Sequence, residues 1–286
     1  PGDCVQVGTT RGGTPARFFR PVVEADRRIL LGNIEMHYFA GYSGGAKALM
    51  PGISDRDAIQ ANHGRMIHPD ARAGLLEGNP VRLDLEEAAA MLGADFILNV
   101  VLDEDLRIVH AVAGDMTEAH RAGCAFLDRM YKIRIPRRAE LVIASPGGYP
   151  KDINLYQAQK SLDNARHAVA DGGIVILAAA CPEGLGERVF EAWLREARTP
   201  GDLVDRIRRE FRLGGHKAAA IALVMERARC LLVSDMPDEL AALTFMTPVP
   251  DLQEAVDRAL SGLPDDAGVL VMPHAGSTLP ITQDSE

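Results

Sequence analysis

The 286-residue chain lacks the features that define several common protein classes. No apolar run approaches the length of a membrane-spanning helix. The four cysteines are scattered without a C-x-x-C pair, so neither a zinc site nor a disulfide framework is predicted. The net charge of -9 argues against a nucleic-acid surface, which would need a basic stripe. With 47% hydrophobic and 25% charged residues, the composition is that of a globular protein, which we expect in the cytoplasm.

The most informative stretch runs from His37 to His63. Gly41, Gly44 and Gly45 fall within five residues, and glycine permits backbone angles and close approaches that other residues resist. Such a turn can present its N–H groups to an anion. His37 precedes the glycines, and Lys47 and His63 follow them. A helix-capping turn needs one glycine and none of these side chains, so the stretch is interpreted as a functional site.

Several functions are compatible with this stretch. Gly41–Gly45 fits the G-x-S-x-G pattern, in which Ser43 would be the nucleophile of a serine hydrolase. That motif needs a long helix directly after the serine, and Pro51 interrupts any helix within two turns. A Walker A loop is excluded, because Lys47 follows alanine and precedes neither Ser nor Thr. A structural turn with a solvated Lys47, or a non-catalytic relative that binds a phosphorylated ligand at residues 44–47, stays open.

The stretch also resembles a known family. The pattern of His37, Gly41, an aromatic residue, Ser43–Lys47 and Pro51-Gly52 is similar to the signature of the nickel-dependent lactate racemases. The resemblance continues over nearly the whole chain, through Asn62-His63, His68–Gly74, Gly78–Pro80, Gly148–Pro150, Asp152–Gln157, Lys160 and Gly214–Lys217.

The resemblance implies an isomerase that racemises or epimerises a lactate-like 2-hydroxy acid. Its cofactor would be a nickel pincer nucleotide (nickel pyridinium-3,5-bisthiocarboxylic acid mononucleotide), bound covalently to Lys47 as a thioamide. By position, His63 would be the nickel ligand, His37 one of two proton-transferring histidines, and Gln157 and Lys160 would hold the substrate, Lys160 through its carboxylate. The other residues that the resemblance places at the cofactor are Phe39, Ser43, Gly44, Gly45 and Tyr156. The resemblance implies cofactor-maturation enzymes as partners, and it is compatible with an oligomeric protein.

In the family, a further N-terminal segment carries an acidic-Arg-Pro motif and the second catalytic histidine. Neither is found here, so we expect the chain to be a fragment or a truncated relative. The roles that the resemblance gives to His63, His37 and Lys47 also agree with the general chemistry of these side chains. Imidazole suits Ni(II), histidine is a base near neutral pH, and a desolvated lysine is nucleophilic.

Other polar residues have less specific interpretations. Gln157 and Lys160 are one helical turn apart and share a face, which by pattern alone favours a solvated surface. His216 and Lys217 follow two glycines, so they either form an anion site at a helix N-terminus or belong to a fold-specific turn. The remaining histidines are interpreted as ordinary loop, surface or core residues: His68, His110, His120, His167 and His274.

The predicted fold class is α/β, with two layered domains at residues 1–134 and 135–286 and mixed or mostly parallel sheets flanked by helices. Uniformly apolar runs at 141–145, 172–178, 230–234 and 268–272 indicate strands covered on both faces. We expect strands also at 29–31, 96–102 and 107–113, and helices at 55–66, 80–91, 117–131, 156–170, 189–198, 202–211 and 216–229. The basic, Pro-containing segment 132–138 is interpreted as a solvated linker.

Overall fold

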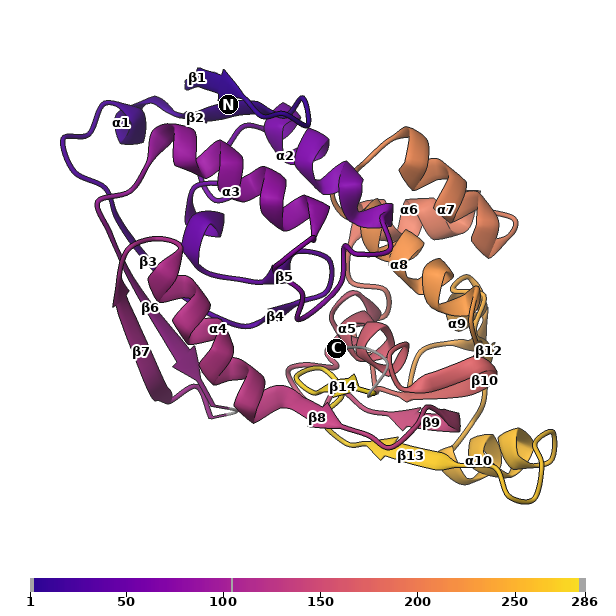
Figure 1. Ribbon diagram of the computed structural model, residues 1–286. Helices are drawn as coiled ribbons and strands as arrows, with labels where there is room; N and C mark the ends of the chain where they lie inside the picture. The colour runs from indigo at the N-terminus through magenta and orange to yellow at the C-terminus, as the bar shows by residue number, and fades with distance from the viewer. Residues whose placement is uncertain (1–2, 104, 283–286) are drawn as a thin grey trace. The chain divides into compact units, whose positions relative to one another are not determined.

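The computed structural model describes residues 3–103 and 105–282, which form two compact units (Figure 1). One unit comprises residues 1–131 and the other residues 132–286, whereas the sequence places the boundary after residue 134. Each unit combines sheets with flanking helices, which confirms the α/β class. Among the described residues, no helix is long and apolar enough to cross a membrane.

The first unit contains a mixed three-stranded sheet. Its strands, in the order β3-β6-β7, are β3 (Ile29–Asn33), β6 (Phe96–Leu102) and β7 (Ile108–Gly114). β3 runs parallel to β6, and β7 runs antiparallel to it. Helix α4 (Glu118–Tyr131) packs on β6 and β7, and its Cys124 and Leu127 join Ile34 and Val101 in one core cluster. This sheet and helix support the glycine-rich stretch that follows β3.

That stretch is built from short elements. In chain order they are β4 (Met36–His37), β5 (Gly41–Tyr42), the 3-10 helix η1 (Gly45–Ala48), α2 (Arg56–His63), the 3-10 helix η2 (Gly64–Ile67) and α3 (Pro80–Leu92). The carboxylate of Asp55 caps α2, and the amide of Asn79 caps α3, whose first residue is Pro80. A separate hairpin, β1 (Cys4–Thr9) with β2 (Pro15–Phe19), and the single turn α1 (Arg20–Val23) precede β3.

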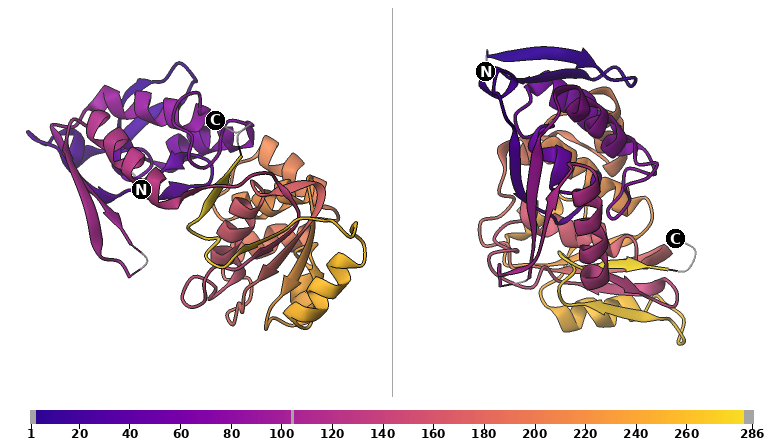
Figure 2. Two further views of the ribbon diagram at one scale, coloured as in Figure 1. Left: turned by 60° about the horizontal axis from the view of Figure 1, so that its bottom comes forward. Right: turned by 60° about the vertical axis from the view of Figure 1, so that its left-hand side comes forward.

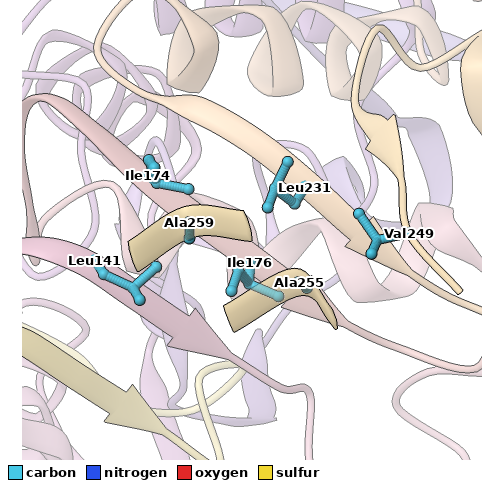
Figure 3. Packing of buried hydrophobic residues seen from close by; sticks show 7 residues of the cluster. All are labelled: Leu141, Ile174, Ile176, Leu231, Val249, Ala255 and Ala259. Atoms are coloured by element: carbon cyan, nitrogen blue, oxygen red, sulfur yellow. The ribbon is translucent and has the colours of Figure 1, made fainter. Parts of the chain in front are cut away.

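The second unit is organised around a five-stranded parallel sheet. Its strands, in the order β12-β11-β10-β9-β13, are β12 (Thr247–Pro248), β11 (Arg229–Val233), β10 (Val169–Ala178), β9 (Ala139–Ala144) and β13 (Val269–Met272). Figure 3 shows Ala255 and Ala259 of α10 (Leu252–Leu260) lying over Leu141, Ile176 and Leu231 on one face of this sheet. The other face packs against α5 (Leu155–Ala165), because side chains alternate between the faces of a strand.

The remaining helices of this unit, among the described residues, are α6 (Arg188–Glu196), α7 (Pro200–Arg209), α8 (Gly215–Met225) and α9 (Asp238–Ala242). They belong to the part of the chain coloured from salmon to orange in Figure 2. α8 packs against α5, α6 and α7, and nine of its eleven residues are buried. Most of these residues are apolar, as a helix covered on all sides requires. This burial places the first turn of α8 against the first turn of α5, which matters for the site below.

Three sequence expectations are wrong. The helix predicted for 216–229 ends at Met225, and Arg229 begins β11. The helix predicted for 156–170 ends at Ala165, because Val169 is fully buried and pairs with Ala139 at the start of β10. The segment 132–138 is not simply a solvated linker: β8 (Lys132–Arg134) pairs in parallel with β14 (Leu279–Ile281), and Ile135 is buried. The helical pattern of residues 156–165 does not continue to Val169, because pairing with Ala139 places Val169 in the sheet.

Candidate active site

The glycines of the turn are required by close packing. Gly41 has φ +77°, and a Cβ atom there would lie 2.1 Å from the carbonyl oxygen of Leu75. Gly45 has φ +55°, and a Cβ atom there would lie 2.7 Å from Cγ of His120. Real Cβ atoms do not approach so closely, and positive φ is unfavourable for other residues. The turn is therefore pressed against the body of the unit and held in one conformation.

Two buried residues of the α3 region fix the carbonyl groups of this turn. Arg82, with 0% of its surface exposed, donates from Nε to the carbonyl of Ala40 at 3.1 Å and from Nη2 to the carbonyl of Tyr42. The Asn79 amide donates to the carbonyl of Phe39 at 3.0 Å. A buried carbonyl without a partner would be costly, so these bonds hold the path of the chain. Sequence reasoning matched Asn79 to the family pattern without a role and did not single out Arg82.

His120 and Asn99 support the turn from the sheet side. His120 Nε2 lies 2.7 Å from the carbonyl oxygen of Ser43, which can only accept, so this nitrogen carries the proton. Burial, with the charge of Arg82 second, lowers the pKa of His120 to about 4, so the ring is neutral near pH 7. Asn99 Oδ1 accepts from the amide of Gly45 at 2.7 Å. From the sequence, His120 is an ordinary surface or core residue; the structure places it in the core, where it also positions the turn.

His63 ends α2 and is 6% exposed. Its Nδ1 lies 3.0 Å from Oδ1 of Asn62. The Asn62 amide nitrogen donates to Oδ2 of Asp84 at 2.8 Å and to the carbonyl of Val81 at 3.0 Å, which identifies Oδ1 as the acceptor. His63 Nδ1 therefore donates, and the lone pair of the ring is on Nε2. A metal-ligating histidine is commonly oriented in this way by its second nitrogen.

Phe39 connects the two histidines of the stretch. Its ring centroid lies 4.6 Å from that of His37 and 4.9 Å from that of His63, both edge-on. Phe39 is buried, so it fixes the separation of the two imidazoles. The amide of Ala40 donates to His37 Nδ1 at 3.2 Å, which favours a proton on Nε2 in the neutral ring.

Lys47 lies in η1, the short helix that follows the glycines, and it is half-buried. Burial, with the charge of Arg82 second, lowers the pKa of its amine to about 7. Within the described ranges 3–103 and 105–282, no carboxylate forms an ion pair with it. A large fraction of this amine is neutral at pH 7 to 8, which makes it a nucleophile. The structural interpretation with a fully solvated Lys47 is wrong.

The environment of Ser43 does not match a nucleophile elbow. Its hydroxyl donates to the carbonyl of Asn33 at 3.0 Å and accepts from the amide of Glu35 at 2.8 Å. The two-residue strand β5 precedes it, and a four-residue 3-10 helix follows. The phosphate-binding interpretation is also weakened, since the amides of residues 43, 45 and 47 all donate to protein acceptors.

The other predicted site residues belong to the second unit, on the first turns of α5. Asn154 caps this helix by accepting from the amide of Gln157 at 3.1 Å. Gln157 is half-buried and Lys160 is exposed, and they lie one turn apart on the same side. Lys217, in the first turn of α8, donates from Nζ to the carbonyl of Tyr156. The structure thus brings His37, Phe39 and His63 into contact in the first unit, which also contains Lys47, whereas Tyr156, Gln157 and Lys160 belong to the second.

The chain matches the lactate racemase N-terminal domain over residues 1–74 and the lactate racemase C-terminal domain over residues 135–279. This chain belongs to the lactate racemase family. It is 37% identical over 280 residues to the lactate racemase of Thermoanaerobacterium thermosaccharolyticum, covering 96% of this chain, and 34% identical over 283 residues to that of Lactiplantibacillus plantarum, covering 93%. The chain spans 66% of the length of each of these curated relatives.

Two solved structures have the same fold as this chain. The lactate racemase apoprotein from Thermoanaerobacterium thermosaccharolyticum superposes with a TM-score of 0.92 at 36% identity, covering 98% of this chain and 68% of that chain. A protein from Thermotoga maritima shares the fold, with a TM-score of 0.71 at 17% identity, covering 99% of this chain and 76% of that chain.

Proposed function

We propose that this protein racemises a small, lactate-like 2-hydroxy acid with a nickel pincer nucleotide attached to Lys47. The observation that carries the proposal is the presence, within residues 37–63, of a lysine amine whose pKa is lowered to about 7 and of a buried imidazole with its lone pair on Nε2. The two relatives at 37% and 34% identity, and the solved structure at 36% identity, are lactate racemases. A serine hydrolase is not favoured, because the hydroxyl of Ser43 is used within the fold.

The donor groups fit such a cofactor. Among residues 3–103 and 105–282, no group of three or more His, Cys, Asp or Glu side chains is placed to hold a metal ion. A metal bound through His63 alone therefore needs its other donors from a bound molecule, and the sulfur atoms of a pincer nucleotide are donors of that kind. When bound, the cofactor would supply a reversible acceptor for the hydrogen on the hydroxyl-bearing carbon of the substrate.

The protein side chains have separate tasks in this proposal. Lys47 anchors the cofactor through its amine, and His63 binds the metal through Nε2. His37 exchanges a proton with the substrate hydroxyl through Nε2: it donates from Nε2 in the tautomer inferred above, and it accepts there in the other tautomer, in which Nδ1 carries the proton and no longer accepts from the amide of Ala40. Phe39 packs beside both histidines. In the second unit, Gln157 and Lys160 hold the substrate, and Lys160 pairs with its carboxylate, since an exposed ammonium is available there.

The test uses protein produced in cells that contain the cofactor-maturation enzymes. Peptide mapping should find a nucleotide-sized adduct on Lys47, metal analysis should find nickel, and chiral chromatography should detect interconversion of D- and L-lactate. Lys47→Ala should abolish the adduct and the racemisation, and Lys151→Ala, at an exposed lysine, should change neither. Fully active protein without an adduct on Lys47 would refute the proposal.

A further inference from the structure

Lys217 makes an unusual pair of contacts with one residue. It is 5% exposed, in the first turn of α8. Its Nζ donates to the carbonyl oxygen of Tyr156 and also stands 4.0 Å from the centroid of the Tyr156 ring, within cation–π range. Phe190 of α6 packs edge-on against the same ring, with centroids 5.7 Å apart. Tyr156 is therefore held by its main chain and by its side chain.

These contacts fix the part of α5 from which the predicted substrate residues project. Tyr156 is the second residue of α5, directly before Gln157. In an α-helix, the carbonyl of residue 156 faces the amide of Lys160. The Lys217 amine is thus an additional donor on the carbonyl of that turn. Because the turn is fixed, the points from which the Gln157 and Lys160 side chains leave the helix, and their Cα–Cβ directions, are fixed as well.

The charges around Lys217 favour an anion nearby. Burial, with the positive charge of Lys160 second, lowers the pKa of Lys217 to about 7, so the two amines are close enough to repel each other. Asp163 is the carboxylate whose charge acts in the opposite direction. Burial also raises the pKa of Asp163 to about 6; this carboxylate is still mostly ionised at pH 7, but its charge acts on Arg166 as well as on Lys217. An added carboxylate beside Lys160 would relieve the repulsion.

We propose that Lys217 is a positioning residue for the substrate carboxylate, because its amine, a hydrogen-bond donor in either protonation state, holds Tyr156 and thereby orients the turn that carries Lys160. This inference rests on the proposed function, in which Lys160 binds the carboxylate of a 2-hydroxy acid. Lys217 itself does not contact the reacting atoms. Its two contacts with Tyr156 set the geometry, and a carboxylate bound beside Lys160 would favour the protonated form of Lys217.

Three variants separate a positioning role from simple packing. Lys217→Met keeps the length and apolar stem of the side chain but removes the charge and the donor. Lys217→Arg keeps both within a larger group. Lys151→Met is the matched control, since Lys151 is exposed in the turn before α5. If only packing matters, methionine is the better replacement in a buried site; if the cation matters, arginine is better.

The first measurement is steady-state racemisation of D- and L-lactate by the cofactor-loaded proteins. Loss of a charge-assisted hydrogen bond and of the cation should raise KM about tenfold or more in Lys217→Met. kcat should change by no more than about threefold, because Lys217 does not touch the reacting carbon. Lys217→Arg should reverse much of this rise in KM, and the KM of Lys151→Met should match that of the wild type.

The second measurement does not depend on turnover. Trp193 is the only tryptophan of the chain, and it packs against Gly215 at the start of α8, where a Cβ atom would lie 2.3 Å from the indole ring. Its fluorescence should report a lactate titration, with binding about tenfold weaker in Lys217→Met. If wild-type protein racemises lactate and Lys217→Met keeps its KM and affinity, this inference alone is overturned. It is also overturned if Met preserves KM better than Arg. Wild-type protein that neither binds nor racemises any 2-hydroxy acid overturns the proposed function and this inference with it.

Discussion

Asn62 fixes the tautomer of His63 through a hydrogen bond of 3.0 Å between Oδ1 and Nδ1. Asn62 cannot easily turn over, because its amide nitrogen already donates to Asp84 and to the carbonyl of Val81. Asp84 in turn accepts from the hydroxyl of Thr10 at 2.6 Å and from that of Thr14 at 2.7 Å. The state of one imidazole at the end of α2 is thus set by a buried chain of hydrogen bonds.

The first prediction concerns this chain. Asn62→Ala should weaken nickel binding about 10- to 100-fold, the usual effect of losing the partner that orients a ligating histidine. His63→Ala should lower nickel occupancy further. In both variants the adduct on Lys47 should persist, because the covalent anchor and the metal ligand are different residues. Nickel content by plasma mass spectrometry and adduct mass by peptide mapping test the two effects separately.

The control for this prediction is Asn164→Ala, which removes another buried asparagine, one that donates to the carbonyl of Ala275 in the second unit. It should reduce stability without changing nickel content. Equal nickel in wild type and His63→Ala would show that the metal is bound elsewhere, and His68 would then be tested.

The second prediction concerns the reactivity of Lys47. Because burial lowers the pKa of its amine to about 7, acetylation of Lys47 by a trace of acetic anhydride should rise through pH 7 and level off above about pH 8. In denatured protein, the same lysine should show an inflection near 10.4, the ordinary value. Competitive labelling followed by peptide mass spectrometry measures both curves. Coincident curves for folded and denatured protein would contradict the burial of this amine.

The sequence predicts much of the framework of the site. β6 occupies 96–102 as expected, Asp55 caps α2, and α3 begins at Pro80. These features depend on local signals, namely hydrophobic patterning, a capping side chain and the fixed φ of proline. The glycines of the turn are equally visible in the sequence.

What the sequence does not reveal is which distant residues require those glycines. His120 lies 77 residues from Ser43, and Arg82 lies 42 residues from Ala40. Neither carries a local motif, because their partners are main-chain carbonyls and are set by tertiary packing alone. The contact between Lys217 and Tyr156, 61 residues apart, is of the same kind. The sequence therefore identifies side chains that carry out chemistry more readily than those that hold them in place.

The third prediction distinguishes the two enzyme classes at Ser43. A serine hydrolase should lose nearly all nucleophilic turnover in Ser43→Ala. In a racemase the variant should retain substantial activity and lose stability, since the hydroxyl bonds with Asn33 and Glu35. We expect a loss of about 0.5–1.5 kcal/mol, the usual net contribution of a hydrogen bond, because the two backbone groups are exposed or only part-buried. Chiral chromatography measures the activity and urea denaturation the stability. The control is Ser277→Ala, which removes an exposed hydroxyl that donates to the carbonyl of His274.

The last prediction concerns acid. The pKa of His120 is lowered from 6.5 to about 4 in the folded protein, mainly by burial. Between these values the unfolded chain binds a proton that the folded chain does not, so the free energy of unfolding should fall as the pH is lowered from about 6.5 to 4. Replacing the ring with a neutral group, as in His120→Gln, should remove this contribution and reduce the pH dependence by about one bound proton. It should also lower stability at pH 7, where the bond to the Ser43 carbonyl is lost.

His216, whose pKa is lowered to about 4 in the second unit, should contribute a separate proton to the pH dependence, and His120→Gln should leave that contribution unchanged. Urea denaturation at a series of pH values tests this, and an unchanged slope in His120→Gln would show that His120 is not held neutral by the fold.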